Sequence, residues 1–154
     1  MCLCPTTERD LADGIGPARA LHDAGLRLSL GTDQHAVVDL FEEARACEMH
    51  ERLRSGRRGR FTPLELLAAV TGHASLGWGD AGLLVAGARA DLVAVRTDSV
   101  RTSGGAPGQI LLTAAAADID TVIVDGRVVV AAGRHRLGDV ATLLRKAIKP
   151  LWVA

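Results

Sequence analysis

The sequence has few aromatic residues and no excess of charge of either sign. Its 154 residues include no tyrosine, two phenylalanines and two tryptophans. Eighteen basic residues balance eighteen acidic ones, so the chain lacks the electrostatic footprint of a nucleic-acid or anionic-membrane binder. Sixteen of the basic residues are arginine, which we attribute to codon composition rather than to a binding patch. We therefore expect neither nucleic acid nor membrane among its partners.

Cysteines and long apolar runs are also scarce. Three cysteines, an odd number, argue against a disulfide framework and favour a reducing compartment. Residues 1–5 have neither the basic segment nor the apolar run of a signal peptide. No run approaches the roughly 20 apolar residues that cross a bilayer. We expect a cytoplasmic protein the size of one ordinary domain.

Strand and helix patterns alternate over residues 1–78. The apolar start, interrupted by Pro5, is typical of a strand stub, and alternating leucines predict a second strand over 26–31. The spacing of apolar residues, together with proline, glycine and a capping box at 62–65, predicts three helices, over 17–25, 37–54 and 63–75. This order is half of a parallel α/β arrangement.

An aspartate follows the second predicted strand. Gly31 permits a tight bend there, and Asp33 emerges at the carboxyl end of the strand, where α/β folds collect catalytic residues. A carboxylate at this place can hold a divalent metal and accept a proton from metal-bound water. An ordinary turn aspartate fits the same pattern.

Residues 79–154 have the pattern of short strands. Strands are predicted over 91–95, 110–112, 121–124 and 127–131, with Asp125-Gly126 as the turn of a hairpin. An amphipathic helix from 140 to 147 ends before Pro150. This half is expected to form a small β domain with a C-terminal helix.

Other side chains allow two interpretations. His35 is either a substrate contact or a structural loop histidine. Cys2 and Cys4 are too close in sequence for a zinc knuckle and are expected to be small buried residues at a strand end. Glu48 and Arg52 are predicted to pair on the exposed face of their helix.

Four segments carry a family resemblance: Cys4-Pro5-Thr6-Thr7-Glu8, Asp13-Gly14-Ile15, Gly31-Thr32-Asp33-Gln34-His35 and Glu42-Glu43-Ala44-Arg45. In this order they resemble the amidohydrolase superfamily and, within it, most resemble the formimidoylglutamate deiminases. Those enzymes hydrolyse N-formimino-L-glutamate to N-formyl-L-glutamate and ammonia in histidine degradation. Residues 75–93 resemble the passage from barrel to small β domain in such enzymes. Gln34 departs from the small serine of the pattern.

The resemblance implies an α/β fold: the C-terminal part of a metal-dependent-hydrolase (β/α)8 barrel over 1–78, followed over 79–154 by part of a small β-sandwich domain and a C-terminal helix. It implies one divalent metal, usually zinc, held by a His-x-His pair, a later histidine and an aspartate that Asp33 matches. Asp33 would ligate this metal and take a proton from the attacking water. His35 would contact the small-molecule substrate.

The chain is short of the ligands that this resemblance requires. It contains no His-x-His, a catalytic zinc needs about three protein ligands, and a complete barrel needs about 250 residues. We therefore expect a C-terminal fragment that is inactive alone and does not retain the metal. Unpaired barrel strands favour association, so a homodimer, or a partner that completes the barrel in trans, is expected. The alternatives are an inactive short interaction module, or a fragment of another aminohydrolase acting on a purine or pyrimidine derivative.

Overall fold

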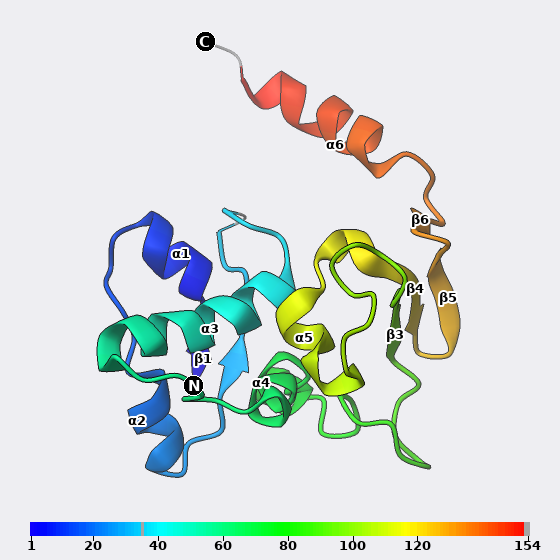
Figure 1. Cartoon of the computed structure of the whole chain (residues 1–154). Helices are drawn as coiled ribbons and strands as arrows, with labels where there is room; N and C mark the ends of the chain where they lie inside the picture. Colours follow the sequence, from blue (N-terminus) through cyan, green and yellow to red (C-terminus); the bar gives the residue numbers. More distant parts are fainter. Residues whose placement is uncertain (35, 153–154) are drawn as a thin grey trace.

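The computed structural model describes residues 1–34 and 36–152 and begins with a pair of parallel strands (Figure 1). Strand β1 (Cys2–Leu3) pairs with β2 (Ser29–Leu30), so that Cys2 lies opposite Ser29 and Leu3 opposite Leu30. Both predicted strands are therefore present. The second is shorter than the alternation over 26–31 predicted.

Four helices accompany the strand pair. They are α1 (Pro5–Asp10), α2 (Ala18–Asp23), α3 (Leu40–Ser55) and α4 (Pro63–Val70). A 3-10 turn, η1 (His73–Leu76), follows α4, which therefore ends earlier than predicted. The predicted capping box starts α4: the backbone N–H of Glu65 donates to Thr62 Oγ1 at 3.2 Å, and Thr62 N–H donates to Glu65 Oε2 at 2.7 Å. Helix α1 was not predicted.

The main core lies between the strand pair and the helices. Leu3 of β1 and Leu30 of β2 are buried in it, together with residues of α2, α3 and α4 and of the segments beside them: Ala18, Ala44, Cys47, Phe61, Leu66 and Ala69. Neighbouring residues of a strand point to opposite faces of the sheet. Cys2 and Ser29 therefore lie on the face of the strand pair opposite to this core.

The second sheet has four antiparallel strands in chain order. They are β3 (Leu92–Val95), β4 (Ile119–Val124), β5 (Arg127–Ala131) and β6 (Arg134–His135). The predicted hairpin is confirmed, because Asp125 (φ 50°) and Gly126 (φ 73°) form the turn between β4 and β5. Asp91 fixes this turn to the start of β3 by accepting the N–H of Asp125 at 2.7 Å.

The strand predicted over 110–112 is wrong. After a 3-10 turn, η2 (Pro107–Gln109), residues Ile110–Thr113 form a short helix, α5, which packs against α3 and α4. Leu111 of this helix is buried in the main core. The sequence pattern of a short apolar run is compatible with a strand or with a buried helix. Here the run packs against α3 as a helix.

Two side chains tie α3 to the segment that leads into β4. Asp39 caps α3 by accepting the N–H of Phe41 with Oδ1 at 2.9 Å, and its Oδ2 accepts the N–H of Ala116 at 2.8 Å. Arg45 donates to the carbonyls of Leu112 at 3.0 Å and Ala114 at 2.6 Å. A third 3-10 turn, η3 (Ala116–Asp118), continues from these contacts into β4.

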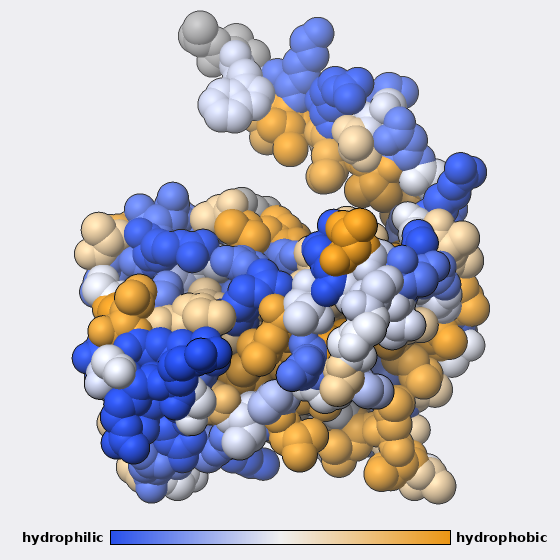
Figure 2. Space-filling model, in the orientation of Figure 1, coloured by the Kyte–Doolittle hydropathy of each residue, from blue (hydrophilic) through white to orange (hydrophobic). Residues whose placement is uncertain are grey.

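The predicted C-terminal helix is present and extends away from the rest of the molecule (Figures 1 and 2). It comprises α6 (Val140–Ile148) and the 3-10 turn η4 (Lys149–Leu151), and no residue of Val140–Ile148 is buried. Its apolar residues are exposed: Val140, Leu143, Leu144, Ile148, Leu151 and Trp152. Within residues 1–34 and 36–152, no helix is long and apolar enough to cross a membrane.

Candidate active site at the carboxyl end of the parallel strands

Asp33 lies where the sequence predicted, directly after β2. The backbone of Gly31 donates to Leu3 O at 3.1 Å, and the chain then turns at Asp33, which adopts a left-handed φ of 42°. The Asp33 side chain is exposed. Thr7 Oγ1 donates to Thr32 O at 3.3 Å, and this bond joins the start of α1 to the strand end. His35, the predicted substrate contact, lies outside the described residues.

The turn is also held from the far end of α1. Gln34 Nε2 donates to Asp10 Oδ2 at 2.8 Å. Gln34 therefore orients the turn beside Asp33, although the residue differs from the serine of the family pattern. Sequence reasoning had not assigned this contact.

Behind the strand end, a buried carboxylate fastens α1 to α3. Glu43 is fully buried and accepts the backbone N–H of Thr6 at 3.0 Å and the Thr6 hydroxyl. Burial raises the pKa of the Glu43 carboxyl, and the bonds from Thr6 oppose that shift. The Cys-Pro-Thr-Thr-Glu segment thus has a structural role: it begins α1 and satisfies Glu43. Sequence reasoning noted both motifs but did not predict the contact between them.

Two thiols lie near the same strand end. Cys2 is exposed and Cys4 half-buried, so the prediction that both are buried is wrong for Cys2, which faces away from the main core. Burial raises the pKa of the Cys4 thiol to about 11, and the Cys2 thiol and the charges of Asp33 and Glu43 act in the same direction. The strand end therefore gathers acidic groups.

The described residues do not by themselves fit a catalytic metal. Among residues 1–34 and 36–152, no three His, Cys, Asp or Glu side chains converge on one point. His22 packs edge-on against Phe61, and His73 Nδ1 lies 2.8 Å from Thr71 O. A catalytic zinc takes about three protein ligands. This part of the chain offers Asp33 as a single ligand.

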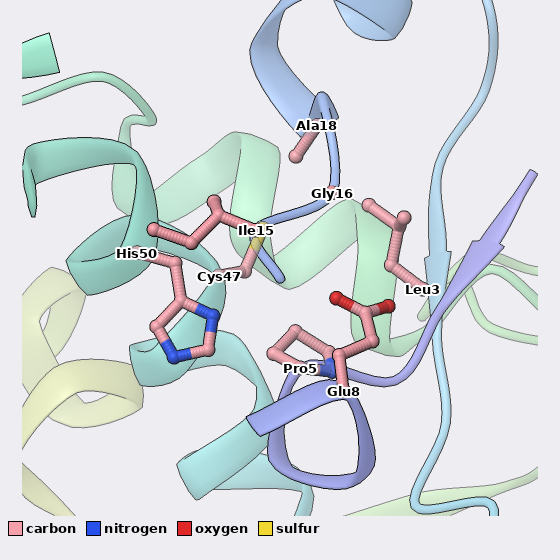
Figure 3. Close-up of a pocket in the computed structure, with 8 residues that line it drawn as sticks. All are labelled: Leu3, Pro5, Glu8, Ile15, Gly16, Ala18, Cys47 and His50. Atoms are coloured by element: carbon pink, nitrogen blue, oxygen red, sulfur yellow. The ribbon is translucent and has the colours of Figure 1, made fainter. Parts of the chain in front are cut away.

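A small cavity lies on the helical side of the strand pair (Figure 3). Its volume of about 10 Å³ is about the room that one water molecule needs. Glu8 and His50 point toward it, beside apolar side chains from β1, α2 and α3. Burial lowers the pKa of the His50 imidazole. Substrate pockets are of the order of 300 Å³ or more, so this cavity is no substrate site.

Comparison with known proteins identifies the family. The model of the Amidohydrolase family matches residues 1–129. The chain belongs to this family. It is 35% identical, over 82% of its length, to a 5-methylthioadenosine/S-adenosylhomocysteine deaminase of Pelotomaculum thermopropionicum. It is 38% identical, over 95% of its length, to an 8-oxoguanine deaminase of Pseudomonas aeruginosa. These alignments cover 31% and 34% of the two relatives, so the chain spans about a third of their length.

Solved structures agree with this membership. The chain matches an adenosine deaminase from Xanthomonas campestris with bound zinc at a TM-score of 0.88 and 28% identity, covering 96% of this amidohydrolase chain and 36% of the other. A Brucella melitensis amidohydrolase matches at a TM-score of 0.83 and 29% identity, with coverages of 98% and 36%. The resemblance to zinc-binding amidohydrolases and to deaminases is thereby confirmed. Formimidoylglutamate as the substrate stays a prediction.

Proposed function

We propose that residues 1–154 supply the last barrel units and the small β domain of a deaminase that releases ammonia from an amidine carbon. Such a carbon is bonded to two nitrogens. Water adds to it, the bond to the departing nitrogen breaks, and a carbonyl and ammonia remain. The observation that supports this function is Asp33 at the carboxyl end of β2 in a chain of the amidohydrolase family.

Asp33 is the one residue to which we assign a catalytic role. Its exposed carboxylate would supply one ligand to a divalent cation whose other ligands lie outside the described residues. The same carboxylate would accept a proton from the attacking water. The geometry that supports this role is the turn held by Thr7 and Gln34, which presents Asp33 at the strand end.

The first candidate substrate is N-formimino-L-glutamate. Its formimino group is an open-chain amidine with one departing nitrogen. The Cys4–Glu8 segment and the Glu42–Arg45 segment, which resemble formimidoylglutamate deiminases, support it. In the structure the two segments are bonded to each other through Thr6 and Glu43.

The second candidate is a purine or purine nucleoside. The amino-bearing carbon of an adenine or guanine ring is also bonded to ring nitrogen, so the same addition of water releases ammonia. The relatives named as 5-methylthioadenosine/S-adenosylhomocysteine and 8-oxoguanine deaminases support this class. Both candidate substrates would undergo the same reaction, in which water adds to the amidine carbon and ammonia is released. They differ in the rest of the molecule, which the barrel loops must recognise.

The test is ammonia release by a protein that carries residues 1–154 together with the barrel segments of its relatives. The substrates are N-formimino-L-glutamate, 5′-methylthioadenosine and 8-oxoguanine. We expect one class to be turned over, and Asp33→Asn to reduce kcat by about 100-fold or more. Asp13→Asn, at an exposed carboxylate between α1 and α2, is the matched control. Full activity in the Asp33 variant, or no ammonia from any of the three, would contradict the proposal.

The 154-residue chain alone is proposed to be inactive and to form a homodimer. Its two parallel strands lack neighbours among the described residues, and unpaired strand edges favour association. Light scattering after gel filtration measures the mass. A monomeric chain, or one that releases ammonia by itself, would contradict this part of the proposal.

A further inference from the structure

The thiols of Cys2 and Cys4 share one small space over Gly31. A Cβ placed on Gly31 would lie 3.5 Å from Cys2 Sγ and 3.6 Å from Cys4 Sγ. Residues two apart in an extended chain point to the same face. Leu3, between the two cysteines, points the other way into the main core. Glycine at position 31 thus leaves open a space that borders both sulfur atoms.

Acidic groups surround Cys4. Burial raises the pKa of the Cys4 thiol, and the Cys2 thiol and the charges of Asp33 and Glu43 add to that shift. Each of these groups is an acid. Negative charge beside Cys4 makes its thiol harder to deprotonate. A cation between the sulfurs would offset that charge, and exposure of Cys2 gives it access from solvent.

We propose that Cys2 and Cys4 bind one soft, thiophilic cation of low coordination number, with Cu(I) as the representative ion. Each thiol releases a proton to solvent, two sulfur–metal bonds form, and no oxidation state changes. Soft thiolate ligands favour Cu(I) and zinc over hard cations. In the described part of the chain no third His, Cys, Asp or Glu side chain converges with the pair. A structural zinc site, with four ligands, does not fit it.

This inference does not rest on the proposed function, because the 154-residue chain itself provides both ligands. The test is an anaerobic titration with Cu(I) in competition with a coloured Cu(I) chelator. We expect one Cu(I) per chain. Cys2→Ser and Cys4→Ser are each expected to weaken binding by more than about 100-fold, since loss of a ligand exceeds the effect of losing an outer-shell contact. Cys47→Ala, at the buried third cysteine, is the matched control and should bind as the unaltered chain does.

Gly31→Ala tests the geometry with both thiols retained. Gly31 lacks the positive φ that disfavours alanine, and the new methyl group would meet the sulfurs at ordinary contact distances. The fold should persist, while the space that borders both sulfurs is filled. We expect weaker Cu(I) binding with an unchanged number of reactive thiols.

Alkylation of the unaltered chain provides a measurement that needs no variant. Cu(I) is expected to protect Cys2 and Cys4 together from iodoacetamide, as read by mass spectrometry of the peptides. Three results would overturn the proposal: binding that persists in the Cys2→Ser/Cys4→Ser double variant, two cations bound independently per chain, or protection of only one of the two thiols.

Discussion

Glu48 Oε2 accepts the backbone N–H of Phe61 at 2.6 Å, across thirteen residues of sequence. The other oxygen accepts the N–H groups of Gly59 at 2.9 Å and Arg60 at 3.2 Å, and Arg52 Nε at 2.6 Å. One fully buried carboxylate therefore organises the loop between α3 and α4. The predicted pairing of Glu48 with Arg52 is confirmed, but its placement on an exposed face is wrong.

Replacing Glu48 should destabilise the chain strongly. Glu48→Ala leaves the buried N–H groups of the loop without their acceptor and should lower the free energy of unfolding by about 3 kcal/mol. Urea unfolding measures it. Glu42→Ala, at a partly exposed carboxylate on the same helix, is the control and should cost about 1 kcal/mol or less. Equal effects of the two substitutions would contradict this account of the loop.

The N-terminus of α4 should weaken in acid. The backbone N–H of Thr62, with Arg19 and the Thr62 hydroxyl, lowers the pKa of Glu65 from 4.5 to about 2. Because the pKa of Glu65 is lower in the folded state than in the unfolded state, its ionised carboxylate stabilises the fold. This stabilisation is complete above about pH 4.5 and is lost as the pH falls toward 2.

Glu65→Gln tests this window, because an amide oxygen can still accept the Thr62 N–H but does not titrate. We expect the free energy of unfolding, measured with urea from pH 6 to pH 2, to fall less steeply in the variant. Asp118, held by Arg101 at 2.8 Å, leaves a remaining acid dependence in both proteins. Identical slopes would show that Glu65 does not titrate as described.

Gly82 and Gly87 form a matched pair for a test of close packing. Both have left-handed φ values, 88° and 89°. A Cβ on Gly82 would clash with Thr71 O, whereas no atom of the described residues lies within 4 Å of a Cβ on Gly87. Gly87→Ala should cost about 1 kcal/mol for the backbone alone. Gly82→Ala should cost about 3 kcal/mol or more, read by thermal unfolding. Equal melting temperatures would contradict the contact with Thr71.

The C-terminal helix should contribute little to the stability of the chain. Leu143 and Leu144 of α6 are 46% and 54% exposed, while Leu66 of α4 is 1% exposed. The double substitution of Leu143 and Leu144 to serine should change the free energy of unfolding by less than about 0.5 kcal/mol. Leu66→Ala should cost about 3 kcal/mol. A loss above about 1 kcal/mol in the double variant would mean that α6 packs on the body.

Local signals account for the elements that could be predicted. Asp125-Gly126 needs two positive φ values and can form little else than a tight hairpin, and the Thr62–Glu65 capping box closes within one turn of α4. Helix α1 was missed although its signal was present, because Pro5 was taken to end a strand and in fact occupies the first turn of a helix. Residues 110–112 form a helix rather than the predicted strand because they pack against α3. The local sequence pattern carries no information about that packing.

The candidate site was predictable only in its position. A strand followed by Gly31 places Asp33 at the strand end, whatever surrounds it. The bonds that hold this end link residues far apart in sequence: Thr6 with Glu43, and Asp10 with Gln34. Pairings over such separations have no periodic signature. The motif residues could be noted from the sequence, but which of them contact one another could not.

Asp39 has a mechanical consequence for the start of α3. Its two oxygens belong to one rigid planar group, with one bonded to the first turn of α3 and the other to the N–H of Ala116, 77 residues further along the chain. While both bonds hold, the first turn of α3 and the lead into β4 move together. A substitution that shifts the four-stranded sheet will therefore displace the start of α3 as well, without touching the residues around it.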